Sequence, residues 1–120
     1  MEGAKIRILL VDDDIDLVSV WAELLEDEGY EVEAVYNGNA AIKWAAGNRF
    51  DLVLLDIMLP DVDGITVCEK LRENPQTKDL PIILMSGSDA LREQGRRCAD
   101  ASLAKPFDLA RLLMLISQFV

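Results

Sequence analysis

The sequence contains no histidine, only two cysteines and no long apolar run. Without histidine, no imidazole of this chain can serve as a metal ligand, a general base or a phosphate carrier. A transmembrane helix needs about 20 predominantly apolar residues, and no apolar run approaches that length, so we expect no membrane insertion. No basic segment precedes an apolar one near the N-terminus, and we expect no secretory signal.

The two cysteines, Cys68 and Cys98, are too few for a disulfide framework, and neither lies in a CxxC motif. Cytoplasmic proteins keep their thiols reduced, and cysteine is among the most frequently buried residue types. We therefore expect two reduced, mostly buried thiols in a cytoplasmic protein.

Basic residues are also scarce. The chain has 12 Lys and Arg against 22 Asp and Glu, which gives a formal net charge of −10. Residues 1–64 hold 15 acidic and 4 basic residues, whereas residues 65–120 hold 7 and 8. Nucleic-acid binding requires clustered positive charge, so we expect no direct contact with nucleic acid. The acidic half suits either a cation site or a solvated surface.

The most conspicuous stretch is the apolar run at 52–55, which leads directly into Asp56. A continuous apolar run of this length, bounded by loop residues, indicates a strand buried on both faces. The length of 120 residues and the hydrophobic content of 51% fit one globular unit with an ordinary core. We therefore expect a single domain that spans residues 1–120.

Strand-like and helix-like segments alternate five times. The composition predicts strands at 6–11, 30–36, 51–55, 81–85 and 101–104. Helical periodicity predicts helices at 15–28, 40–46, 65–73, 89–98 and from 108 onward. This alternation indicates right-handed βαβ crossovers. The expected fold is α/β, a doubly wound five-stranded parallel sheet with helices on both faces.

Reactive side chains stand where the predicted strands end. Asp12 and Asp13 follow the first strand, Asp56 the third, Ser86 the fourth and Lys105 the fifth. The carboxyl ends of parallel strands share one edge of the sheet, which is where ligands bind in open α/β sheets. Each residue alone has an ordinary explanation as a helix cap or turn residue. Their common position favours a shared site.

The chemistry of this set points to phosphoryl transfer. Three clustered carboxylates repel one another, and Mg²⁺ would relieve that repulsion while keeping water ligands that a phosphate can replace. Lys105 would add a second positive charge, and Ser86 could donate a hydrogen bond to a phosphoryl oxygen. A carboxylate such as Asp56 can then act as the nucleophile that forms an acyl phosphate.

Four motifs resemble the receiver domain of bacterial two-component response regulators, of the chemotaxis-regulator type. They are Leu10–Asp14, Leu54–Gly64, Met85–Gly87 and Lys105–Phe107. The resemblance covers nearly the whole chain, in order. It implies a flavodoxin-like sheet with the strand order 2-1-3-4-5.

The resemblance also implies site roles. Asp56 would take a phosphoryl group from a sensor histidine kinase or a phosphotransfer protein. The metal Mg²⁺ would be held by the set Asp12, Asp13, Asp56 and the backbone carbonyl of Met58. Ser86 and Lys105 would contact the phosphoryl group, and the peptide bond between Lys105 and Pro106 would be cis.

A protein of this kind would be a signalling switch rather than an enzyme, because it would catalyse only its own phosphorylation and dephosphorylation. The resemblance implies a downstream protein target on the face formed by the fourth helix, fifth strand and fifth helix. It also implies a dimer that could depend on phosphorylation.

The chain departs from the family pattern at Ser102, three residues before Lys105, where the family usually carries an aromatic residue that reports phosphorylation. We expect a weaker structural readout or another route. The apolar side chain of Met58 could obstruct attacking water. Arg92, Arg96 and Arg97, on the predicted fourth helix, are interpreted as a solvated face, with a partner surface as the alternative.

Three other functions compete with this interpretation. A receiver-like docking module with phosphorylation-independent output stays open because of Ser102. A phosphatase with an Asp nucleophile would want a second Asp two residues after Asp56, where the chain has Met58. A nucleotide or flavin binder is disfavoured because the first strand ends in acidic residues instead of a glycine-rich phosphate loop.

Overall fold

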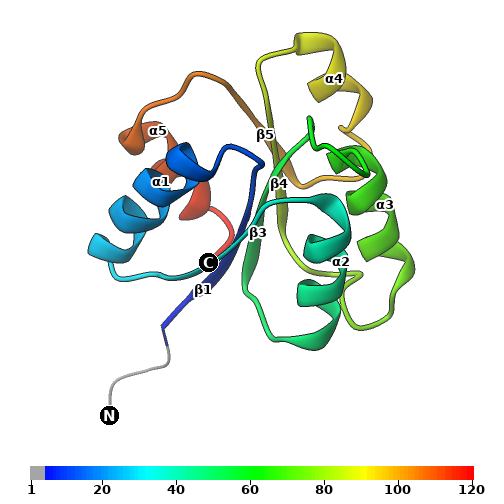
Figure 1. The fold of residues 1–120 in the computed structure, drawn as a ribbon, viewed down its shortest axis with the longest axis horizontal. Helices are drawn as coiled ribbons and strands as arrows, with labels where there is room; N and C mark the ends of the chain where they lie inside the picture. The colour runs from blue at the N-terminus through cyan, green and yellow to red at the C-terminus, as the bar shows by residue number, and fades with distance from the viewer. Residues whose placement is uncertain (1–4) are drawn as a thin grey trace.

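A computed structural model describes residues 5–120 and contains one parallel sheet flanked by helices (Figure 1). The strands are β1 (Arg7–Val11), β2 (Glu31–Val35), β3 (Leu52–Asp56), β4 (Ile82–Ser86) and β5 (Ala101–Ala104). The helices are α1 (Ile15–Asp27), α2 (Gly38–Gly47), α3 (Gly64–Glu73), α4 (Asp89–Gln94) and α5 (Leu109–Ile116). The strand order is β2-β1-β3-β4-β5, so the predicted fold class and order are confirmed.

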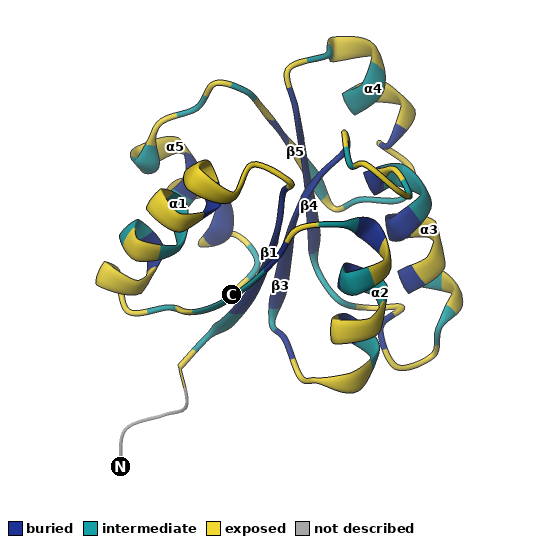
Figure 2. Cartoon of the chain, viewed as in Figure 1, coloured by how far each residue is buried: buried dark blue, intermediate teal, exposed yellow. Residues whose placement is uncertain are grey.

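The sheet separates two hydrophobic cores. Alternate residues of each strand point to opposite faces, so Leu9 and Val11 pack with α2 and α3, whereas Ile8 and Leu10 pack with α1 and α5. Every residue of β3 and β4 is buried, while the exposed residues gather on the outer sides of the helices (Figure 2). The continuous apolar run that ends at Asp56 is therefore the centre of the fold.

Each of the five helices begins after a polar residue that accepts a hydrogen bond from the backbone N–H three residues further on. Such caps satisfy a backbone donor that the helix itself leaves free, and each contributes about 1 kcal/mol. The caps are Asp14, Asn37, Asp63, Ser88 and Asp108. They place the helix starts on the same side of the sheet as the carboxyl ends of the strands.

Helix α4 is shorter than the sequence predicts, because it ends at Gln94 and not at residue 98. Gly95 follows, and a Cβ atom at this position would lie 2.4 Å from Cδ1 of Leu84 in β4. The backbone approaches the sheet closely here, and residues 96–99 then turn back through short-range hydrogen bonds to Glu93 and Gly95. Packing against β4 overrides the helical periodicity.

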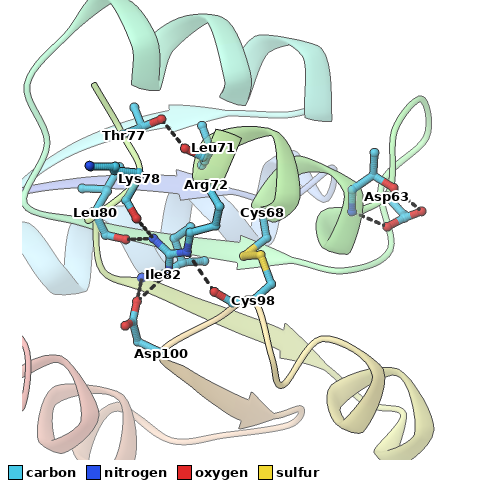
Figure 3. Close-up of a disulfide and its surroundings, with 11 residues drawn as sticks. Asp63, Cys68, Leu71, Arg72, Thr77, Lys78, Leu80, Ile82, Cys98 and Asp100 are labelled. Atoms are coloured by element: carbon cyan, nitrogen blue, oxygen red, sulfur yellow. Dashed lines mark hydrogen bonds and ion pairs between the residues drawn. A yellow bond between two sulfur atoms is a disulfide. The ribbon is translucent and has the colours of Figure 1, made fainter. Parts of the chain in front are cut away.

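The prediction of two reduced thiols is wrong in this structure. Cys68 on α3 and Cys98 in the connection from α4 to β5 form a disulfide, with Cα atoms 6.2 Å apart (Figure 3). The expectation of burial holds for Cys68, which is fully buried. The two cysteines are 30 residues apart in sequence, so only the fold brings them together.

Arg72 of α3 anchors the same connection. Its guanidinium donates hydrogen bonds to the carbonyls of Cys98, Lys78 and Leu80 and forms an ion pair with Asp100 (Figure 3). The Asp100 carboxylate also accepts the backbone N–H of Ile82, at 2.8 Å. The start of β5 is therefore tied to α3 and to β4 by polar contacts as well as by the disulfide.

Within residues 5–120, no helix combines the length and the apolar character that a membrane crossing requires.

Candidate phosphoacceptor site

Three carboxylates meet at the carboxyl end of the sheet, at the edge that the sequence predicts. Asp12 follows β1, Asp13 comes next, and Asp56 is the last residue of β3. One carboxylate oxygen from each lies within 4.8 Å of the others. Asp12 and Asp56 are each only 5% exposed, whereas Asp13 is exposed to solvent. The cluster is therefore buried on one side and open on the other.

Lys105, which follows β5, completes this cluster. Its Nζ lies 2.8 Å from Oδ2 of Asp12 and 3.2 Å from Oδ2 of Asp56. The second oxygen of each carboxylate accepts a backbone N–H, from Asp14 for Asp12 and from Met58 for Asp56. The polar atoms of the two buried carboxylates are thus paired, as buried charges require. The peptide bond between Lys105 and Pro106 is cis, as predicted.

The electrostatics of the site favour an added cation. Burial raises the pKa of Asp56, and the neighbouring Asp12 carboxylate raises it further against the opposing effect of Lys105. For Lys105, burial acts to lower the pKa, but the hydrogen bond to Asp12 and the charges of both carboxylates outweigh burial, so the pKa is raised. Three carboxylates and one ammonium leave a formal charge of −2 at full ionisation.

The donor set fits Mg²⁺. This ion prefers oxygen ligands at 2.0–2.1 Å in octahedral geometry, which places two ligand oxygens at most about 4.2 Å apart. The three carboxylate oxygens, within 4.8 Å of one another, need only small side-chain rotations to reach that spacing. A divalent cation would also cancel the formal charge of −2. The exposed side of Asp13 leaves room for water ligands.

Ser86 ends β4 beside the acceptor strand, where Asp56 of β3 pairs in register with Met85. Its hydroxyl oxygen accepts the backbone N–H of Ser88 at 3.0 Å. Its carbonyl accepts both the backbone N–H of Lys105 at 3.0 Å and Nη1 of Arg92 at 2.6 Å. Ser86 is 2% exposed, and these bonds connect it to Lys105 and to α4.

The loop that follows Asp56 is held in place by contacts that the sequence interpretation missed. Asp61 accepts the backbone N–H groups of Gly38 at 2.7 Å and Asn39 at 2.9 Å, at the start of α2. These hydrogen bonds, that of Asn39 above all, lower the pKa of Asp61 to about 2. At Gly64, a Cβ atom would lie 2.3 Å from the carbonyl oxygen of Asp56. The loop is therefore held at Asp61 and at Gly64.

Met58 and Trp21 are two further side chains near the candidate site. Met58 projects from this loop and is 65% exposed. Trp21 of α1 is partly buried, with its ring centroid 4.8 Å from that of Phe107. Both rings line a small cavity together with Asp12 and Lys105, so Trp21 lies beside the candidate site.

The family model for the response regulator receiver domain matches residues 8–117. The chain is 40% identical over 113 residues to the DNA-binding dual master transcriptional regulator RpaA of Synechocystis, covering 89% of this chain and 46% of that protein. It is also 40% identical over 105 residues to the response regulator PleD of Caulobacter vibrioides, covering 85% and 23%. The chain thus spans about half or less of these curated relatives.

Solved structures that contain magnesium are similar as well. The receiver domain of a sensor histidine kinase from Pseudomonas aeruginosa, with a magnesium ion coordinated in its active-site cleft, gives a TM-score of 0.90 at 30% identity, covering 97% of this chain and 98% of that one. The response regulator TrrA from Thermotoga maritima, in complex with Mg²⁺ and BeF, gives a TM-score of 0.89 at 32% identity, and the match covers 96% of this chain and 99% of that one.

Proposed function

We propose that Asp56 is the residue that accepts the phosphoryl group. This chain belongs to the response regulator receiver domain family, which has a phosphoacceptor signalling role. The observation that carries the proposal is the ion-paired cluster at the sheet edge. The ammonium of Lys105 contacts both Asp12 and Asp56, and Asp13 completes a three-carboxylate group. Asp56 belongs to the central buried strand, so its position is fixed by the core.

The residues that would hold Mg²⁺ are Asp12, Asp13, Asp56 and, by resemblance to the family, the carbonyl of Met58. Bound there, the ion supplies positive charge that stabilises the phosphoryl oxygens during transfer. Lys105 would supply a second charge, and its contact with Asp56 would pass to a phosphoryl oxygen once Asp56 is modified. Ser86, next to Asp56 in the sheet register, would donate its hydroxyl proton to another phosphoryl oxygen.

The transfer needs no general base, because the attacking group is already a carboxylate. A carboxylate oxygen of Asp56 forms a bond to phosphorus as the bond from phosphorus to the donor breaks. The donor atom is a phosphohistidine nitrogen of a partner, or the acyl oxygen of a small phosphodonor, and it leaves with the bonding electron pair. In hydrolysis, water attacks phosphorus and the Asp56 carboxylate is regenerated.

The domain is a signalling domain, not an enzyme that turns over a separate substrate. We infer that its catalysis is limited to its own phosphorylation and dephosphorylation. The alternative of a receiver-like docking module whose output ignores phosphorylation is not favoured, because the family has a phosphoacceptor role.

Partners and setting are further parts of the proposal. We infer that a sensor histidine kinase or phosphotransfer protein is the donor, and that a downstream protein binds the α4–β5–α5 face, with a dimer possible after phosphorylation. Family membership also supports one receiver domain over residues 1–120 and a cytoplasmic location. The net charge of −10 argues against direct nucleic-acid binding.

The test is the intact mass of the protein after incubation with Mg²⁺ and acetyl phosphate, compared with the variant Asp56→Asn. We expect one phosphoryl group on the wild type and none on the variant. Removal of Mg²⁺ by a chelator should abolish the addition. Because Trp21 shares a cavity with Asp12 and Lys105, its fluorescence should change when Mg²⁺ binds, and Asp13→Asn should weaken that response. Equal addition to Asp56→Asn would refute the assignment.

A further inference from the structure

Arg92 is the residue of α4 whose placement the sequence did not predict. The sequence indicates a solvated face for the three arginines after β4, but the side chain of Arg92 is only 17% exposed. Its Nη1 donates to the carbonyl of Ser86 at 2.6 Å, and its Nη2 pairs with Asp89, one turn earlier on α4. Arg96, one turn further on, is 78% exposed and forms an ion pair with the surface residue Glu93, at 3.4 Å.

The Ser86 carbonyl is a junction between the acidic cluster and α4. It accepts the backbone N–H of Lys105, the residue whose ammonium holds Asp12 and Asp56, and it accepts the Arg92 guanidinium as well. A hydrogen bond to a charged donor is among the stronger ones in proteins. A displacement of the Ser86 peptide therefore acts directly on the side chain of Arg92.

A second contact links Ser86 to the start of the same helix. The Ser86 hydroxyl oxygen accepts the N–H of Ser88, and the Ser88 hydroxyl oxygen in turn caps α4 by accepting the N–H of Leu91. A phosphoryl group on Asp56 would bring new acceptor oxygens next to Ser86. As the Ser86 side chain turns to donate to them, it loses the hydrogen bond from the Ser88 N–H, and the backbone between Ser86 and Ser88 that this bond holds is free to shift.

Ser102 provides the space for Arg92 to respond. It lies on β5, and its small side chain lines a surface cavity of about 470 Å³ between α4 and β5. Leu84, Arg92 and Ala99 line the same cavity. Among residues 5–120, no aromatic side chain lines this cavity, so open space adjoins the guanidinium of Arg92.

We propose that Arg92 is the positioning residue that transmits the phosphorylation state of Asp56, through the Ser86 carbonyl, to helix α4. This inference rests on the proposed phosphoacceptor role of Asp56. In the unphosphorylated protein, the guanidinium holds α4 against the end of β4 through Ser86 and Asp89. Phosphorylation weakens the contact with the Ser86 carbonyl, Arg92 moves into the cavity beside Ser102, and α4 shifts with it.

The test compares Arg92→Met with the matched control Arg96→Met, which removes the other arginine that lines the cavity. Backbone amide chemical shifts are measured with Mg²⁺, with and without beryllofluoride, which mimics the phosphoryl group. We expect the shift changes of residues 89–95 to fall at least twofold in Arg92→Met and to keep the wild-type size in Arg96→Met. Both variants should still gain one phosphoryl group from acetyl phosphate.

A second measurement needs no variant and so does not depend on folding of the Arg92→Met protein. In the wild type, the guanidinium resonance of Arg92 should shift when beryllofluoride is added, while that of Arg96 should not. An unchanged Arg92 resonance, or a full wild-type response of residues 89–95 in Arg92→Met, would overturn this inference alone. A wild type that neither gains a phosphoryl group nor responds to beryllofluoride would overturn the phosphoacceptor role itself.

Discussion

The disulfide between Cys68 and Cys98 makes a quantitative prediction about stability. It closes a loop of 30 residues, and the chain-entropy relation for cross-links gives about 3.6 kcal/mol of stabilisation at 25 °C for a loop of this size. Reduction should leave the native packing largely intact, because Arg72 still ties α3 to Cys98 and Asp100. We therefore expect reduction to lower the free energy of unfolding by about 2–4 kcal/mol.

The assay is urea unfolding of the oxidised and the reduced protein, with the double variant Cys68→Ala, Cys98→Ala as the control. A cross-link also changes the surface that is exposed on unfolding. The comparison must therefore use the free energies of unfolding and their slopes against urea concentration, not the unfolding midpoints alone. Reductant should destabilise the wild type and leave the double variant unchanged. The difference in the free energy of unfolding between the reduced wild type and the double variant then gives the packing contribution of the two sulfur atoms. We expect most of it from the fully buried Cys68.

The refuting result is equally direct. If the air-oxidised protein unfolded in denaturant shows two titratable thiols, or if reductant does not change its stability, the disulfide is absent. The original expectation of two free thiols would then be restored. A cytoplasm keeps most thiols reduced. The difference in the free energy of unfolding between the oxidised and the reduced protein therefore also gives the amount by which oxidation could stabilise this domain.

Three other predictions concern the loop after the acceptor. In the wild type, the Asp61 carboxylate stabilises the fold at pH values above its pKa of 3.8 in the unfolded chain, and this stabilisation is lost as the pH falls from 3.8 towards 2. Asp61→Asn should lack it, so the free energies of unfolding of the two proteins should converge across that pH interval. Gly64→Ala should lower the free energy of unfolding by about 1–3 kcal/mol, because a Cβ would lie 2.3 Å from the Asp56 carbonyl oxygen. The control Gly47→Ala, where a Cβ would meet nothing within 4 Å, should be neutral or slightly stabilising. Thermal unfolding of both variants measures the difference. Met58→Asn should shorten the acyl-phosphate lifetime severalfold, as followed by the decay of the phosphorylated mass, on the hypothesis that the Met58 side chain, which is 65% exposed, obstructs attacking water; an unchanged lifetime would exclude that role.

The general fold and the reactive edge could be predicted because they depend on local patterns. The apolar run before Asp56 marks a buried central strand, and the alternation of strands and helices leaves few topologies for a chain of this size. Strand ends then place Asp12, Asp56 and Lys105 on one edge, and the structure brings them within hydrogen-bond distance. The cap at Asp14 also follows from its position before the first helix.

What the sequence did not predict depends on contacts between distant segments. The pairing of Cys68 with Cys98 requires α3 to lie beside the connection from α4 to β5. The early end of α4 depends on Gly95 meeting Leu84 of β4, which no periodicity reveals. One feature of the sequence could have indicated the burial of Arg92. Four residues after the Ser88 cap, its side chain points back towards the helix start and the end of β4.

The most direct test of the central claim locates the phosphoryl group on the chain. After reaction with acetyl phosphate and Mg²⁺, borohydride reduces an acyl phosphate of aspartate to homoserine, which peptide mass spectrometry can assign to a residue. We predict homoserine at Asp56 in the wild type, with Asp12 and Asp13 unmodified, and no homoserine in Asp56→Asn. Homoserine at another aspartate, or none despite a phosphorylated intact mass, would contradict the assignment of Asp56 as the acceptor.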